Sequence, residues 1–315
     1  MKNFGLIGAA GYIAPRHMAA IRQTGNQLTV AMDPADSVGI IDSHFPDSAF
    51  FSEFERFDRH VDKLRRGGRS DKLDYISICS PNYLHDSHMR FALRSDADAI
   101  CEKPLVLNPW NIDGLAEIEE STGRRINTIL QLRVHPAILA LRQRILDAPS
   151  DGRKFEVDLT YVTARGKWYL HSWKGDERKS GGIATNIGVH FFDMLHFVFG
   201  DLQLSQAHVA QPTRAAGFLE YRHARVRWFL SLDIKDVPAG QPPGQRTFRS
   251  IIVDGQEFEF SGGFADLHTL SYEAILAGKG FGLETSRTAV ETVAAIRTAR
   301  PIAGGERHPL AFAAR

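Results

Sequence analysis

The sequence predicts an α/β protein with two domains: an N-terminal domain built on a doubly wound parallel sheet, and a C-terminal α+β domain with a largely antiparallel open sheet. Short apolar runs alternate with helical patterns over the first half of the chain, which is typical of βαβ units. After about Pro136 the apolar runs follow one another more closely, and Asp254-Gly255 between two of them is a strong hairpin signal. We expect the two domains to comprise residues 1–135 and 136–315.

Each expected strand of the first domain is a short apolar run, and most of these runs end at a glycine, a proline or a polar turn. A glycine turn follows the first run, Asp33-Pro34 the second and Ser80-Pro81-Asn82 the third. Turn residues of these types stop a strand because they favour tight or left-handed backbone conformations. The expected strands are residues 3–7, 28–32, 75–79, 99–101 and 126–131.

The helices expected between these strands show apolar spacing of three and four residues. Three of them are residues 15–24, 84–94 and about 108–122. A further helix is predicted over residues 50–66, where five apolar side chains share one helical face, and we assign this stripe to the core rather than to a ligand site. Its members are Phe51, Phe54, Phe57, Val61 and Leu64.

The second domain is predicted to hold strands that neighbour each other in sequence, with helices covering one face of their sheet. The expected strands are residues 155–163, 203–211, 217–221, 224–232, 246–253 and 256–260. The expected helices are residues 137–146, 187–199, 264–276 and 287–298. The broad apolar face of such an open sheet indicates an oligomer.

Composition excludes several classes of protein. The chain has 315 residues, with 38 Lys and Arg against 37 Asp and Glu, and this balance argues against a nucleic-acid binder. Only Cys79 and Cys101 are present, so a disulfide scaffold is not expected. The start of the chain resembles neither a signal peptide nor a membrane span, and no run of about 18 apolar residues occurs. We expect a cytoplasmic protein without a membrane partner.

The turn after the first strand has the composition of a phosphate-binding loop. Gly8 and Gly11 precede a helix, whose N-terminus can stabilise a pyrophosphate. Ala10 and Ile13 replace two glycines of the usual pattern, so the turn alone is weak evidence, and a simple tight turn is the alternative. Asp33 ends the second strand, where a carboxylate binds ribose hydroxyls and repels a 2′-phosphate, which favours NAD over NADP. Its alternative role is a cap before Pro34.

Two further segments carry groups that can transfer a proton. Lys103 follows the fourth strand, at the edge of a parallel sheet where ligands bind. Asn186 and His190 lie four residues apart and share a helical face if the helix already begins at Asn186. Asp193, three residues further on, could fix the tautomer of His190 or a nearby segment of backbone. Asp193 and His196 also suggest a metal, but the sequence offers no third ligand at convincing spacing, and we expect no metal.

A loop between these segments joins basic and aromatic residues. It is either an exposed loop with incidental charges or a site for an anionic ligand, with cations on phosphate or carboxylate and rings against a base or sugar. Its candidate ligand residues are Arg165, Lys167, Trp168, Tyr169, Lys174, Lys179 and Ser180.

These elements together resemble the glucose–fructose oxidoreductase/inositol dehydrogenase/MocA (Gfo/Idh/MocA) family of oxidoreductases over nearly the whole chain. Glu102-Lys103-Pro104 with the later His190 is specific for it. Within the family, the chain is most similar to dehydrogenases of UDP-N-acetylglucosaminuronate that serve O-antigen sugar synthesis in lipopolysaccharide. The segments that carry this likeness are GLIGAAGYIAPRH, FFSEFERFDRH, SICSPNYLHDSH, ICEKPLVLNPWN, NTILQLRVHP and WYLHSWKGD through NIGVHFFD.

The resemblance implies an NAD-binding Rossmann domain, a substrate domain, and oxidation of the C3′ hydroxyl to a ketone. The implied cofactor contacts are Gly8, Gly11, Tyr12, Ile13, Asp33, Ser80, Asn82, His85, Glu102, Lys103 and Gln131. The implied catalytic residues are Lys103, His190 and Asn186, and these three also join the loop residues in contacting the UDP-sugar uronate. Homotetramers and reoxidation of NADH by 2-oxoglutarate are further implied possibilities.

Position 186 departs from the family pattern, which usually has an aspartate there. The Asn186 amide cannot act as a general base, so proton transfer falls to Lys103 or His190, and the sequence leaves open which of them is the base. Another sugar or inositol dehydrogenase of the family is the first alternative. A non-catalytic NAD(H)-binding regulator is the second, although retention of Lys103 and His190 argues against it.

Overall fold

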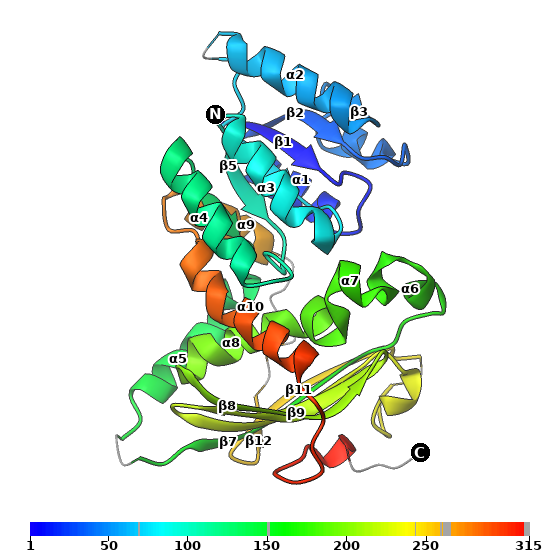
Figure 1. The fold of residues 1–315 in the computed structure, drawn as a ribbon, viewed down its shortest axis with the longest axis vertical. Coiled ribbons are helices and arrows are strands. Elements are labelled where there is room, and N and C mark those ends of the chain that lie inside the picture. The colour runs from blue at the N-terminus through cyan, green and yellow to red at the C-terminus, as the bar shows by residue number, and fades with distance from the viewer. Residues whose placement is uncertain (69, 150–151, 243, 259, 261–265, 312–315) are drawn as a thin grey trace. The chain divides into compact units, whose positions relative to one another are not determined.

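A computed structural model describes residues 1–68, 70–149, 152–242, 244–258, 260 and 266–311, and Figure 1 shows its elements. The chain forms two compact units. The first comprises Met1–Gln131 with Ala265–Arg287, and the second comprises Leu132–Phe264 with Thr288–Arg315. The units therefore differ from the two contiguous domains expected from the sequence, because a late segment of the chain returns to pack in the first unit.

The first unit contains the predicted parallel sheet. Its strand order is β3-β2-β1-β4-β5-β6, and every neighbouring pair in it is parallel. The order reverses at β1, where a doubly wound sheet binds its ligand outside the carboxyl ends of the strands. The strands are β1 (Asn3–Ile7), β2 (Gln27–Met32), β3 (Ala49–Phe51), β4 (Tyr75–Ile78), β5 (Asp98–Cys101) and β6 (Ile126–Thr128).

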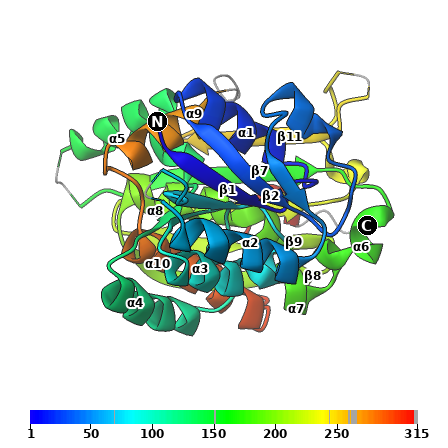
Figure 2. The same cartoon turned by 90° about the horizontal axis from the view of Figure 1, so that it is seen from above.

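Helices cover both faces of this sheet. Helix α1 (Ala14–Gln23) lies beside α9 (Leu267–Leu276) on one face, and α2 (Phe54–Arg66), α3 (His85–Arg94) and α4 (Trp110–Thr122) lie on the other, as Figure 2 shows. The α1 face buries Phe4, Leu6 and Met18 together with Tyr272 of α9. The sequence placed the helix over residues 264–276 on the second sheet, and this was wrong because its apolar side packs against α1.

The helix predicted over residues 50–66 begins later than expected. Residues Ala49–Phe51 form the edge strand β3 beside β2, and Glu53 has an extended backbone before the helix starts at Phe54. The assignment of its apolar stripe to the core is confirmed for Phe57 and Val61, whereas Phe51, Phe54 and Leu64 are partly exposed. Phe57 and Val61 are buried, and the rings of Phe54 and Phe57 lie 5.2 and 5.6 Å from that of Phe91 in α3. The run over residues 126–131 forms only a three-residue strand, because a 3-10 turn (Gln131–Val134) follows it.

The second unit contains a six-stranded sheet in the order β12-β11-β7-β10-β9-β8. Its pairs are antiparallel except for β7 with β10, which run parallel. The hairpin at Asp254-Gly255 is confirmed, with φ of 50° and 77° at the two residues, as a two-residue turn of primed type requires. The strands are β7 (Phe155–Thr163), β8 (Leu202–Gln211), β9 (Arg214–Tyr221), β10 (Ala224–Ser231), β11 (Thr247–Val253) and β12 (Gln256–Glu257).

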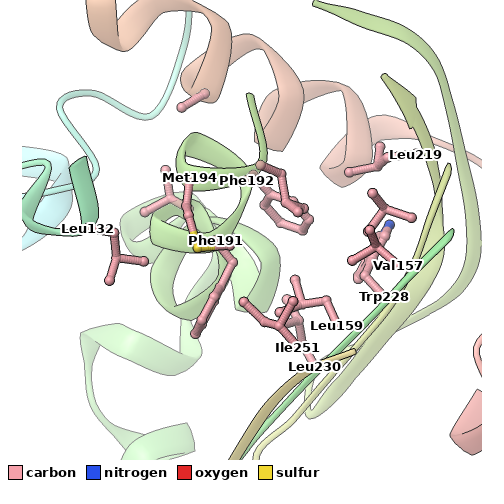
Figure 3. Packing of buried hydrophobic residues seen from close by; sticks show 14 of the residues in the cluster. Leu132, Val157, Leu159, Phe191, Phe192, Met194, Leu219, Trp228, Leu230 and Ile251 are labelled. Carbon is pink, nitrogen blue, oxygen red and sulfur yellow. The ribbon is translucent and has the colours of Figure 1, made fainter. Parts of the chain in front are cut away.

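The core of the second unit lies between one face of this sheet and its helices. Phe192 of α8 (Val189–Phe199) packs edge-on against Trp228 of β10, with the ring centroids 5.2 Å apart, and Figure 3 shows this side of the helix facing the sheet. Helix α5 (Pro136–Leu146) and the later part of α10 (Leu283–Thr298) add further apolar side chains to this cluster. The part of the chain that the structure describes contains no helix long and apolar enough to cross a membrane.

Candidate active site

The loop between β1 and α1 requires glycine for two physical reasons. Gly8 has a φ of +90°, and a Cβ placed on it would lie 2.6 Å from the backbone of Cys79 and Ser80 at the end of β4. A Cβ on Gly11 would lie 3.0 Å from the Gly8 carbonyl oxygen. Both glycines therefore let the chain turn tightly against the carboxyl end of the neighbouring strand. Tyr12 extends into solvent, 92% exposed.

Asp33 closes this loop from the end of β2. One carboxylate oxygen accepts the Ala10 N–H at 3.0 Å, and the other accepts the Ala35 N–H at 2.9 Å. Each oxygen keeps a second lone pair, which can receive a ribose hydroxyl. Residues 34–36 are Pro, Ala and Asp, so no cation follows Asp33 to attract a 2′-phosphate. Ile13, at the N-cap of α1, has no side-chain group to cap the helix, which leaves the helix N-terminus available to an anion.

The turns after β4 and β5 are tied together by a buried histidine. His85 lies within hydrogen-bond distance of the Ser80 carbonyl oxygen through Nε2 at 2.9 Å and of the Pro104 carbonyl oxygen through Nδ1 at 2.7 Å. Burial lowers the pKa of His85 although both backbone contacts favour its protonation. The sequence assigned His85 to the cofactor, and here the ring holds two loops at the ligand-binding edge of the sheet. Asn82 is buried in the same segment.

Glu102 and Lys103 extend from the end of β5. Lys103 is half-buried, and Glu102 is 6% exposed. The Glu102 carboxylate contacts His17 and His268 and also accepts the Lys103 backbone N–H at 3.2 Å. The sequence pattern assigns no role to His17 or His268, because no motif spacing links residues so far apart.

The structure thus places most of the cofactor residues predicted from the sequence at the end of the first sheet where its strands have their carboxyl termini. Their shared feature is a position at or just after the carboxyl end of β1, β2, β4 or β5, and Gln131 follows β6. These residues are Gly8, Gly11, Tyr12, Ile13, Asp33, Ser80, Asn82, His85, Glu102 and Lys103.

In the second unit, Asn186 lies in a π-helical turn (Ala184–Gly188) that leads into α8, and His190 lies in the first turn of α8. The Asn186 amide donates a hydrogen bond to the hydroxyl of Tyr169. Tyr169 is buried, and burial raises its pKa, so its hydroxyl stays protonated. A Cβ on Gly188 would lie 2.7 Å from Leu230 Cδ1 and 2.8 Å from the Phe192 ring, so an alanine there would have to displace these buried side chains. Asn186 is itself buried, at 9% exposure.

The role suggested for Asp193 needs correction. Its carboxylate accepts three hydrogen bonds from Arg133 at 2.7, 2.9 and 3.1 Å, and both side chains are buried. Such a bidentate ion pair attaches α8 to the segment that follows β6. The carboxylate is engaged by a guanidinium, not by the imidazole that the sequence suggested. Arg133 is a residue that sequence reasoning missed, because its partner lies sixty positions away.

The basic and aromatic loop forms two short helices, α6 (Trp168–His171) and α7 (Glu177–Ser180). Trp168 is 57% exposed, while the Lys174 ammonium lies 4.2 Å from the Trp173 ring and 5.8 Å from the Trp168 ring. Ser180 is buried, and its hydroxyl bridges the Asp176 carbonyl oxygen and the Gly182 N–H. Arg165, Lys167 and Lys179 are exposed. The loop thus presents cations and one indole to solvent, whereas Ser180 shapes the backbone.

Fold and site together define an oxidoreductase with a dinucleotide-binding domain followed by an α/β domain. Residues 2–129 match the model of the oxidoreductase family with an NAD-binding Rossmann fold, and residues 153–235 match the model of that family's C-terminal α/β domain. The chain belongs to the Gfo/Idh/MocA family of oxidoreductases.

A solved relative covers nearly the whole chain. The WlbA (WbpB) dehydrogenase of Thermus thermophilus is 51% identical, with a TM-score of 0.93, over 98% of this chain and 99% of that chain. It was solved in complex with NAD and UDP-GlcNAcA, and also with NAD and alpha-ketoglutarate.

Curated relatives match over shorter stretches. D-glucoside 3-dehydrogenase of Escherichia coli is 26% identical over 41% of this chain and 36% of its own length. Inositol 2-dehydrogenase of Rhizobium meliloti is 27% identical over 64% of this chain and 56% of its own length. The chain therefore spans between about a third and somewhat over half of these curated relatives.

Proposed function

We propose that this protein is an NAD-dependent dehydrogenase that oxidises the C3′ hydroxyl of UDP-N-acetylglucosaminuronate to the 3-keto sugar nucleotide. The observation that carries the proposal is the 51% identity, across 98% of the chain, with a dehydrogenase solved with NAD and UDP-GlcNAcA. The site residues support it independently, because the chain has the glycine turn, Asp33, Lys103 and His190 that this chemistry needs.

The residues present fit NAD. The glycine turn lets the backbone approach a pyrophosphate at the N-terminus of α1, and the free lone pairs of Asp33 suit a ribose diol. When bound, NAD supplies a nicotinamide ring that accepts a hydride from C3′. Ser80, Asn82 and His85 would shape the edge of this site, and Gln131 would lie near the nicotinamide ribose.

The chain's own task is to take the hydroxyl proton as the carbon–hydrogen bond breaks. Lys103 or His190 accepts that proton, and a cationic Lys103 would also stabilise negative charge developing on the oxygen. Asn186 orients the substrate through its amide, which Tyr169 holds in place. The exposed cations of the loop, Arg165, Lys167 and Lys179, together with Lys174, suit the diphosphate and the carboxylate of the substrate.

We further propose that 2-oxoglutarate reoxidises the NADH, since the Thermus thermophilus relative was solved with alpha-ketoglutarate. A homotetramer and a cytoplasmic location also remain predictions.

The test is mass spectrometry of UDP-N-acetylglucosaminuronate after incubation with the protein and NAD, with and without 2-oxoglutarate. Loss of two hydrogens from the sugar nucleotide is expected, with more product when 2-oxoglutarate is present. Lys103→Ala should abolish turnover and leave NAD binding largely intact, whereas Lys63→Ala, at an exposed position of α2, should leave both unchanged. Oxidation of free sugars or inositol without a UDP requirement would favour the other family activities, and bound cofactor without hydride transfer to any sugar would favour a regulator.

A further inference from the structure

A chain of buried polar side chains runs through the first unit behind Glu102. The Ser77 hydroxyl lies 2.6 Å from the Tyr272 hydroxyl, which lies 2.7 Å from Nδ1 of His17. Nε2 of His17 and Nε2 of His268 lie 3.0 and 2.9 Å from the same oxygen of Glu102. Each of the five side chains is less than a tenth exposed. The network joins β4, α1, α9 and the end of β5, and of its members only Glu102 is among the cofactor contacts predicted from the sequence.

Because the Glu102 carboxylate can only accept hydrogen bonds, the positions of the protons on the neighbouring imidazoles and hydroxyls follow from it. A carboxylate oxygen only accepts, so both imidazoles donate Nε2–H to Glu102. A neutral His17 then accepts the Tyr272 O–H at Nδ1, and the Tyr272 oxygen accepts the Ser77 O–H. Burial lowers the pKa of His17, which keeps it neutral. Burial favours a protonated Glu102, but the hydrogen bonds from the two histidines outweigh this and hold the pKa of Glu102 well below its usual range.

The same carboxylate holds the backbone of the residue that follows it. The second oxygen of Glu102 accepts the Lys103 N–H at 3.2 Å, so the side chain bends back onto its own strand end. With His17 and His268 on one oxygen and the Lys103 N–H on the other, the carboxylate cannot rotate without breaking a buried hydrogen bond and leaving a buried polar group unpaired, which is unfavourable. Glu102 is therefore a fixed anchor directly before Lys103.

We propose that His17 and His268 are positioning residues that clamp Glu102 and thereby orient Lys103 for proton transfer. The orienting role rests on the function proposed above, whereas the clamp itself does not. His17 lies in the first turns of α1, directly after the glycine loop, so the same helix contributes to the dinucleotide site and to the clamp. The clamp also explains why α9 returns to the first unit: it supplies His268 and Tyr272.

A metal centre is the rival interpretation, because His17, Glu102 and His268 each present one donor atom and these atoms lie within 4.8 Å of one another. The distances favour hydrogen bonds. Ligands of one tetrahedral zinc, each about 2.0–2.1 Å from the ion, lie roughly 3.3 Å apart. The nitrogen–oxygen distances of 2.9 and 3.0 Å are those of direct N–H···O contacts.

The clamp is tested without substrate by ring 15N NMR of the histidines in the full chain, with His17→Gln and His268→Gln used to assign the two signals. We expect both rings as Nε2–H tautomers, with His17 neutral at neutral pH because burial lowers its pKa. An Nδ1–H tautomer at either ring, a cationic His17 at neutral pH, or stoichiometric zinc or iron in the purified protein by elemental analysis would each overturn the clamp.

The orienting role is tested by kinetics of His17→Ala, His268→Ala and the milder Tyr272→Phe, which leaves His17 without a partner at Nδ1. We expect kcat to fall at least tenfold in each alanine variant and less in Tyr272→Phe, while the Kd for NAD changes less than threefold. His17→Gln and His268→Gln keep an N–H donor and should recover most of kcat.

His308→Gln is the matched control, because His308 is another buried histidine bonded to a hydroxyl, but it lies in the second unit. Unchanged kcat in the folded alanine variants, or an equal loss in His308→Gln, would refute the orienting role. Should the wild type fail to oxidise the sugar nucleotide, the proposed function fails, and the NMR result still decides the clamp.

Discussion

Acid should destabilise the second unit through His308, and the size of this effect follows from its surroundings. His308 is 3% exposed, its ring stacks on Phe229, and its Nε2 lies 3.0 Å from the Thr160 hydroxyl. Burial lowers its pKa from 6.5 to about 4, with Asp158 opposing and Arg227 assisting the shift. The unfolded chain therefore binds a proton below pH 6.5 that the folded protein does not bind until about pH 4.

Stability must fall as the pH decreases through this window. A histidine with these two pKa values reduces the free energy of unfolding by about 2 kcal/mol between pH 7 and pH 5. His308→Gln removes the titrating group and keeps a side chain that can bond to Thr160. The variant should therefore lose about 2 kcal/mol less than the wild type over the same interval.

Urea unfolding at pH 7 and pH 5, followed by the fluorescence of the buried Trp228, measures this difference. For each protein the free energy of unfolding at pH 5 is compared with its own value at pH 7. A loss of packing in the variant lowers both values and therefore does not affect the difference between them. Equal pH dependence in the two proteins would refute the reasoning, because it would mean that His308 titrates alike in the folded and unfolded states. His88 has a similarly lowered pKa of about 4, and His88→Gln should reduce the pH dependence of the first unit by a similar amount.

Three further predictions concern the site. Gly8→Ala should abolish NAD binding in a calorimetric titration, because its Cβ would meet the backbone at 2.6 Å, whereas Gly25→Ala, also at positive φ but in open space, should retain binding. Arg133→Met should lower the free energy of unfolding by about 3–5 kcal/mol, since it leaves Asp193 buried without its ion pair. The double variant Arg133→Met/Asp193→Leu should be more stable than Arg133→Met in a denaturant titration, and equal stability of the two variants would contradict this explanation. Tyr169→Phe removes the acceptor of the Asn186 amide and should reduce kcat/KM for the sugar nucleotide about tenfold, with Tyr161→Phe in β7 as the control.

The sequence predicts the parts of the fold that depend on local chemistry. The turns after β1, β2 and β4 are marked by Gly8, Asp33-Pro34 and Pro81, and each lies where the pattern placed it. The hairpin at Asp254-Gly255 is equally local. The edge strand β3 was missed because Phe51 fits the helical spacing of the following residues, and only pairing with β2 distinguishes the two structures. That pairing is a tertiary contact, and the spacing of apolar residues along the chain contains no information about it.

The candidate site likewise contains residues that local sequence reveals and residues that only tertiary contacts reveal. Candidate site residues at the ends of strands, such as Lys103 and Asp33, can be proposed from the sequence because strand ends can be located from it. Residues that support them, such as His268 and Arg133, are not, because their partners are 166 and 60 positions away. A lone histidine in a helix is usually interpreted as a core or surface residue, and nothing near position 268 contradicts that interpretation.

Each unit buries a carboxylate, but the groups that stabilise it differ between the two units. This difference indicates where substitutions will be tolerated. In the first unit an anionic Glu102 is held by hydrogen bonds from His17 and His268, so its burial depends on those hydrogen bonds. In the second unit Asp193 is neutralised by Arg133. Replacing an ion pair by apolar residues of similar size can preserve stability, whereas no apolar side chain can accept the hydrogen bonds that Glu102 receives from His17, His268 and the Lys103 N–H. We therefore expect the Arg133–Asp193 pair to be exchangeable as a pair, and Glu102 to tolerate no replacement without loss of activity.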